Sequence, residues 1–147
     1  MKRITFLLSM ALVFSLNSCG QDYKKLPNSK VDKSNVRIAR DFATKYLEQS
    51  KKGETYTFNN EAIPMVKNYL TAENQKAVYE SLKSQFGDFK DLEYEETWIS
   101  PENEQIRTHR FKSTFEKSNK KLEVRVVLNE ADKITGFWIR PWSDMFP

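Results

Sequence analysis

The sequence predicts an α+β protein in which three N-terminal helices pack on a curved, four-stranded antiparallel sheet. Between residues 34 and 86, apolar residues recur every three or four positions, which is the period of an amphipathic helix. From residue 88 onward they recur at every second position, which is the period of a strand. Aromatic residues form 13% of the 147-residue chain and supply enough apolar volume for one core. A run of helices followed by a run of strands favours the α+β class.

Three helices are expected in the first half of the chain. The first begins at Ser34, a typical N-cap residue, and ends at Gly53, whose backbone readily takes the left-handed conformation that closes helices. The second follows Asn60. The third runs from Thr71 to about Phe86, and its predicted apolar face is Val78, Leu82 and Phe86, with contributions from Ala77 and Tyr79.

Four strands are expected in the second half, separated by short polar turns. They are predicted at about residues 92–98, 107–115, 122–128 and 134–140. Short connections between consecutive strands predict an antiparallel meander. One face of such a sheet can pack on the helices while the other stays in contact with water.

The N-terminus differs in composition from the rest of the chain. Lys2 and Arg3 are followed by an apolar run of 13 residues, Ile4–Leu16. This run is too short for a membrane-spanning helix, which needs ~20 residues, and it fits the apolar segment of a secretory signal. The alternative interpretation is a buried helix of the folded protein.

The apolar run ends in Leu16-Asn17-Ser18-Cys19, which resembles the lipobox of bacterial lipoproteins. Asn17 departs from the commonest pattern, in which a small residue occupies that position. The resemblance implies cleavage after Ser18, a diacylglyceryl thioether on Cys19, and a domain held at a membrane of the bacterial cell envelope, outside the cytoplasm. We therefore expect residues 1–18 to be a signal peptide, 19–33 a lipidated cysteine with a flexible polar tether, and 34–147 a single domain.

Charge and composition exclude several functional classes. Lys and Arg number 24 and Asp and Glu number 20; without residues 1–18 the balance is 22 against 20. This small excess, mixed in sign, does not predict a nucleic-acid surface. A single His and a single Cys predict no metal centre, and no motif predicts a cofactor.

Several short motifs follow one another along the chain. They are Gly53-Glu54-Thr55-Tyr56, Leu70-Thr71-Ala72-Glu73, Phe86-Gly87-Asp88-Phe89, Val126-Val127-Leu128-Asn129 and Lys133-Ile134-Thr135-Gly136-Phe137, with Tyr79 and Leu82 between the second and third. Their order is similar to that of the nuclear transport factor 2-like superfamily, within which a group of secreted bacterial domains is a closer match. The resemblance covers roughly residues 34–140. It implies a cone of helices held in a curved sheet, with a pocket inside, and implies no particular reaction.

Candidate pocket residues follow from the strand faces and the aromatic content. We expect a concave apolar site near Tyr46, Tyr56, Tyr94, Trp98, His109 and Phe111. His109, the only imidazole, is expected to be a polar contact there rather than a catalyst. The acidic residues around Glu93 and Glu95 alternate with apolar ones, as on the solvated face of a strand, and predict no calcium site.

These observations predict a lipid-anchored envelope protein whose domain binds a small ligand or a partner protein without catalysing a reaction. One alternative is an enzyme that uses His109 with a pocket carboxylate. Another is a structural domain that forms a homodimer through the outer face of the sheet. The contents of the pocket distinguish the first two, because an enzyme needs an oriented base or nucleophile there.

Overall fold

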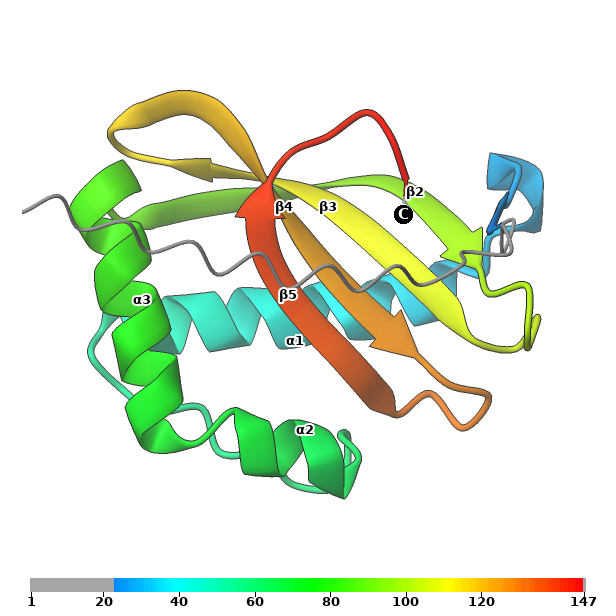
Figure 1. Cartoon of the computed structure of the whole chain (residues 1–147), viewed down its shortest axis with the longest axis horizontal. Helices are drawn as coiled ribbons and strands as arrows, with labels where there is room; N and C mark the ends of the chain where they lie inside the picture. Colours follow the sequence, from blue (N-terminus) through cyan, green and yellow to red (C-terminus); the bar gives the residue numbers. More distant parts are fainter. Residues whose placement is uncertain (1–22, 147) are drawn as a thin grey trace, which may run out of the picture.

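The computed structural model describes residues 23–146 and shows an α+β fold with three α-helices and a five-stranded antiparallel sheet (Figure 1). The strands are adjacent in space in chain order: β1 (Lys24–Lys25), β2 (Phe89–Ile99), β3 (Arg107–Phe115), β4 (Ser118–Leu128) and β5 (Ile134–Pro141). The α+β class and the antiparallel meander are confirmed. The apolar run, the lipobox-like motif and Cys19 lie outside the described residues.

The fifth strand comes from the segment expected to be a flexible tether. Lys24 of β1 pairs with Ile99 and Lys25 pairs with Trp98, and the Leu26 amide donates to the Thr97 carbonyl over 2.9 Å. A short 3₁₀ helix, η1 (Asn28–Lys30), follows. The expectation of a flexible tether through residue 33 is therefore wrong from Lys24 onward, because backbone pairing holds this polar segment without needing an apolar pattern.

Helix α1 (Lys33–Lys51) lies across one face of the sheet (Figure 1). Its N-cap is Asp32 rather than the expected Ser34: the Asp32 carboxylate accepts a hydrogen bond from the Ser34 amide over 2.8 Å. Gly53 has a φ of +77°, which confirms it as the helix stop. The buried face of α1 includes Phe42 and Tyr46.

Helices α2 (Pro64–Tyr69) and α3 (Ala72–Phe86) follow, with α2 beside β5 and α3 against the end of α1 (Figure 1). The Thr71 hydroxyl accepts from the Asn74 amide, so Thr71 caps α3 as expected. The predicted apolar face of α3 is only partly right. Val78 is 41% exposed, whereas Tyr79 is buried and its hydroxyl is 3.2 Å from an Asp88 carboxylate oxygen.

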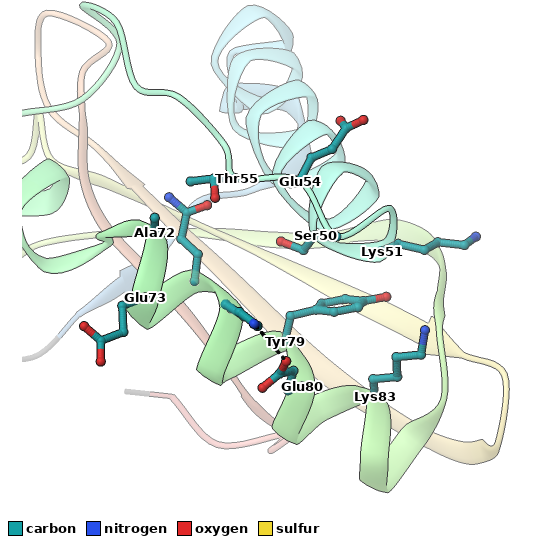
Figure 2. Close-up of a pocket in the computed structure, with 12 residues that line it drawn as sticks. Ser50, Lys51, Glu54, Thr55, Ala72, Glu73, Tyr79, Glu80 and Lys83 are labelled. Carbon is teal, nitrogen blue, oxygen red and sulfur yellow. Dashed lines mark ion pairs between the residues drawn. The ribbon is translucent and has the colours of Figure 1, made fainter.

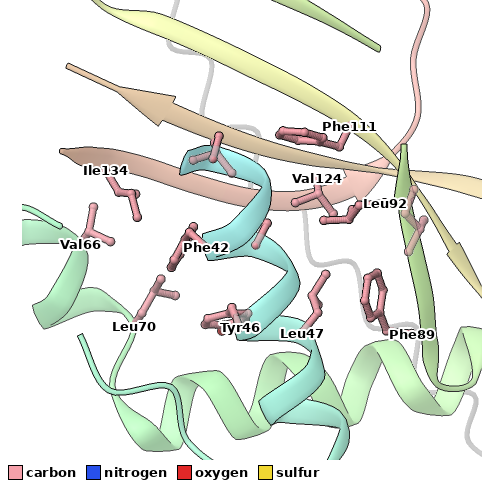
Figure 3. Close-up of a cluster of buried hydrophobic side chains, with 14 of the residues drawn as sticks. Phe42, Tyr46, Leu47, Val66, Leu70, Phe89, Leu92, Phe111, Val124 and Ile134 are labelled. Carbon is pink, nitrogen blue, oxygen red and sulfur yellow. The ribbon is translucent and has the colours of Figure 1, made fainter. Parts of the chain in front are cut away.

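The hydrophobic core lies between α1 and the helix-facing side of the sheet. Figure 3 shows side chains of α1 meeting those of the strands; the labelled core residues are Phe42, Tyr46, Leu47, Val66, Leu70, Phe89, Leu92, Phe111, Val124 and Ile134. A register shift between Tyr94 and Glu96 interrupts the alternation of β2. Beyond this β-bulge, the Thr97 side chain lies on the helix-facing side of the sheet. The side chains of Glu96 and Trp98 lie on the opposite face, here called the outer face.

Candidate binding site

The six predicted pocket residues do not form one site. Tyr94 and Phe111 are in ring contact at 5.9 Å and Tyr46 and Tyr56 at 6.1 Å, all on the helix-facing side of the sheet. Trp98 lies on the outer face, where its ring stacks on Phe146 at 4.7 Å. The expectation that Trp98 shares a pocket with the others is wrong, because the bulge in β2 reverses its orientation.

His109 is completely buried on β3. Its Nδ1 atom lies 2.9 Å from the Thr97 hydroxyl, which in turn lies 2.8 Å from the Tyr94 hydroxyl. Burial, with a smaller contribution from the positive charge of Arg107, lowers the pKa of His109 to about 4, so the imidazole is neutral at pH 7. Among the described residues, Nε2 has no hydrogen-bond partner. These contacts give His109 the surroundings of a core residue.

Aromatic rings fill the space between α1, the segment after it and β5. Phe42 contacts the rings of Tyr56, Phe58 and Phe137 at 5.1–5.9 Å, and Tyr46 contacts Phe137 at 4.8 Å. Burial raises the pKa of Tyr46 and of Tyr56 to about 12. Large side chains therefore occupy the centre of the domain.

A first groove, of about 600 Å³, separates the end of α1 from α3 (Figure 2). Lys51, Glu54, Tyr79, Glu80 and Lys83 are among its walls, so charges of both signs alternate along it. Two of its cations are engaged by the protein itself. The Lys51 ammonium donates to the Phe89 carbonyl over 3.1 Å, and Lys83 pairs with Asp88 at 3.1 Å. A ligand in this groove would have to share or displace these two contacts.

A second groove, of about 250 Å³, lies between α2 and the free edge of β5, and we name it the apolar groove. Its walls are Met65, Val66, Tyr69, Leu70, Thr135, Gly136, Phe137 and Trp138. Met65 is 67% exposed, Tyr69 69% and Trp138 52%, although all three are large and mainly apolar. Within residues 23–146, only Val78 and Met145 are other large apolar side chains with comparable exposure.

Gly136 allows one wall of the apolar groove to form. The indole of Trp138 lies so close to the Gly136 Cα that a Cβ atom there would clash with the ring. The absence of a side chain at Gly136 leaves room for the Trp138 indole, which lines the groove together with Tyr69 and Met65 of α2. The sequence offered a signal for this site: Met65 and Tyr69 are four residues apart on a short helix, so they project from the same face.

The outer face of the sheet carries a group of buried and partly buried charges, which we name the outer-face ion cluster. It consists of Glu96, Arg110, Glu123, Arg125 and Arg140. The C-terminal segment covers it, since the Arg110 guanidinium lies 4.3 Å from the centroid of Trp142 and donates to the Ser143 carbonyl over 2.6 Å. Sequence patterning did not predict this cluster. Its members alternate with core residues on neighbouring strands, where charged side chains are expected to be solvated.

Comparison of the chain with protein-family models, with curated proteins and with solved structures gave no match. Among residues 23–146, no helix has the length and hydropathy needed to span a membrane, and no group of three His, Cys, Asp or Glu side chains is placed to hold a metal ion.

Proposed function

We propose that the protein is a lipid-anchored binding protein of the bacterial cell envelope, and that the apolar groove between α2 and β5 is its binding site. The anchor is inferred from the charged start of the sequence, its apolar run and the lipobox-like motif that ends at Cys19. The two or more acyl chains of a lipoprotein anchor would hold the domain stably at a membrane.

The binding proposal rests on one observation. Three exposed, mainly apolar side chains, Met65, Tyr69 and Trp138, line the same concavity. Single exposed apolar side chains are common on protein surfaces, whereas a contiguous apolar depression is typical of a site that buries a ligand or a partner. A volume of about 250 Å³ accommodates an acyl or aromatic group, or two apolar side chains of a partner protein. The Tyr69 hydroxyl and Trp138 indole offer polar groups at its rim.

The finer fold assignment, a nuclear transport factor 2-like cone, also remains our proposal. It is supported by the order of the elements, with helices preceding an antiparallel meander and packed on one of its faces. In such a cone the central space would be filled by rings such as Phe42, Tyr46 and Phe137, and binding would move to the apolar groove at the edge.

Neither alternative function gains support from a specific contact. The nearest polar partner of His109 is the Thr97 hydroxyl rather than a carboxylate, which does not favour an acid–base role. The outer face of the sheet carries the outer-face ion cluster, which Trp142 and Phe146 cover, so a second copy would meet the C-terminal segment rather than the strands.

The anchor is tested by feeding labelled fatty acid to the bacterial host and comparing the wild-type protein with Cys19→Ser. The proposal predicts label in the wild type and none in the variant. A wild-type protein that carries no label would refute the anchor. The binding role of the groove is independent of this result and is tested by dye binding.

The groove is tested with anilinonaphthalene sulfonate, a dye that fluoresces in apolar sites. We expect the double variant Met65→Asp/Tyr69→Asp to weaken dye binding by about tenfold, which corresponds to about 1.4 kcal/mol. Val78→Asp is the matched control, because Val78 is an exposed apolar residue on α3 outside the groove. Equal dye affinity in the wild type and the double variant would contradict the assignment.

A further inference from the structure

The two ends of the described chain meet beside the outer face of the sheet. The rings of Tyr23 and Phe146 are in edge-to-face contact at 5.0 Å, and Phe146 stacks on Trp98 of β2. Tyr23 immediately precedes β1, which is the edge strand opposite β5. The point at which the chain leads back toward Cys19 is therefore fixed on the domain surface.

The chain between this point and the proposed lipid anchor is short. Four Cα-to-Cα steps separate Cys19 from Tyr23. Even a fully extended chain covers at most about 14 Å in that number of steps. If Cys19 is lipidated, which is part of the proposed function, the membrane interface must lie within about this distance of Tyr23.

The surface around Tyr23 has the chemistry of a membrane interface. Met145 is 80% exposed, and Trp142 and Phe146 beside it are partly exposed. Trp142 donates from its indole nitrogen to Asp144 over 2.8 Å, which holds the segment in a turn that presents Met145. Lys24 and Lys25 are exposed on the adjoining edge, although Lys25 also pairs with Glu96 at 2.6 Å. Tyr and Trp rings with neighbouring Lys side chains are typical of the headgroup region of bilayers.

We infer that the surface formed by Tyr23–Lys25 and Trp142–Phe146, here named the terminal patch, rests against the lipid bilayer in the anchored protein. Met145 inserts among the headgroups, and the lysines face the phosphates. The apolar groove lies at the opposite edge of the sheet, four strand spacings or about 19 Å from β1, and so stays accessible to other envelope molecules.

The test uses the protein as purified from the membranes of its bacterial host, placed in vesicles of phosphatidylethanolamine and phosphatidylglycerol that contain a photoactivatable phospholipid. After irradiation, mass spectrometry maps the lipid adducts and measures the mass of the Cys19 peptide in the same sample. We expect adducts on Tyr23–Lys25 and Trp142–Phe146 at several times the yield on Met65 and Tyr69. Met145→Asp should lower the yield at the terminal patch several-fold, whereas the matched control Met65→Asp should not.

The outcomes separate the inference from the proposed function. A lipidated Cys19 with adducts concentrated at Met65, Tyr69 or Trp138, or with none on the domain, would overturn the orientation while the anchor stands. Adducts that Met145→Asp leaves unchanged would also overturn it. An unmodified Cys19 peptide would refute the anchor, and the orientation with it.

Discussion

The Arg110 guanidinium binds the Glu123 carboxylate through two parallel hydrogen bonds, of 3.0 and 3.1 Å, and both side chains are completely buried. Arg125 and Arg140 donate to the same carboxylate over 2.6 and 3.0 Å, and Arg110 also bonds to Glu96. One carboxylate thus holds three arginines. Because isolated buried charges are costly, the outer face of the sheet depends on Glu123.

Glu123→Gln should therefore destabilise the fold strongly. The substitution removes the negative charge and leaves three guanidinium groups with Glu96 as the one remaining carboxylate of the cluster. Breaking a buried ion pair in this way typically costs about 3–5 kcal/mol. Chemical denaturation measures the effect, and Glu130→Gln, at an exposed turn position, is the matched control. A variant as stable as the wild type would show that the cluster does not hold the outer face together.

The same carboxylate makes stability depend on acid pH. Burial alone would raise the pKa of Glu123, but hydrogen bonds from Arg110, Arg125 and Arg140 outweigh it and lower the pKa to about 2, from 4.5 in an exposed group. The ionised form is favoured by folding, so its contribution is present above about pH 4.5 and is lost as the pH falls toward 2. Denaturation at several pH values should show this loss in the wild type and a flatter profile in Glu123→Gln.

His109 should contribute a separate pH dependence at higher pH. Its folded-state pKa of about 4 lies below the usual 6.5, so the unfolded chain binds a proton first. Stability should be constant above about pH 6.5 and fall by up to about 3 kcal/mol as the pH drops toward 4. His109→Gln, which retains a group able to bond to Thr97, should remove this slope. An unchanged slope in the variant would mean that His109 is not buried as described.

Removal of residues before Ser34 should destabilise the domain. The deletion removes the pairing of β1 with β2, the ion pair between Lys25 and Glu96, and the contact between Tyr23 and Phe146. We expect a chain that begins at Ser34 to melt on the order of 5 °C below one that begins at Gly20. Equal melting temperatures would mean that residues 24–33 behave as the free tether that their polar composition predicts.

Gly136→Ala should alter the apolar groove without unfolding the protein. The added Cβ displaces the Trp138 indole, which is half exposed and can turn away into solvent. We expect changed tryptophan emission and weaker dye binding with a stability loss below about 1.5 kcal/mol. Wild-type dye affinity in this variant would show that the position of Trp138 does not shape the site.

Periodicity predicted the main elements of the fold. The apolar spacing of Ala39, Phe42 and Tyr46 located α1, and the alternation around Phe111 and Val124 located the central strands. These signals are strong because one face of each element is buried along its whole length. The strand β1 left no such signal, because its two lysines are exposed and hold it to the sheet through backbone hydrogen bonds and one ion pair.

The candidate site was harder to predict because it depends on contacts between distant segments. A single bulge after Tyr94 places Trp98 on the outer face, and no residue type in β2 predicts this bulge. From the sequence alone, Arg110 and Glu123 would be assigned to the solvated face of their strands. In the structure the C-terminal segment covers them. The apolar groove likewise requires α2 to be placed beside β5, through the bond from the Ile63 amide to the Ile134 carbonyl over 3.0 Å.

The most direct test of the central claim is site-specific photo-crosslinking in the living host. A photoreactive phenylalanine analogue at position 69 should form one discrete adduct with a ligand or envelope protein, and the added substitution Trp138→Ala should suppress it. The same analogue at position 78, an exposed position on α3 outside the groove, should give no such adduct. Absence of an adduct at position 69, or the same adduct at both positions, would contradict the assignment of the apolar groove as the binding site.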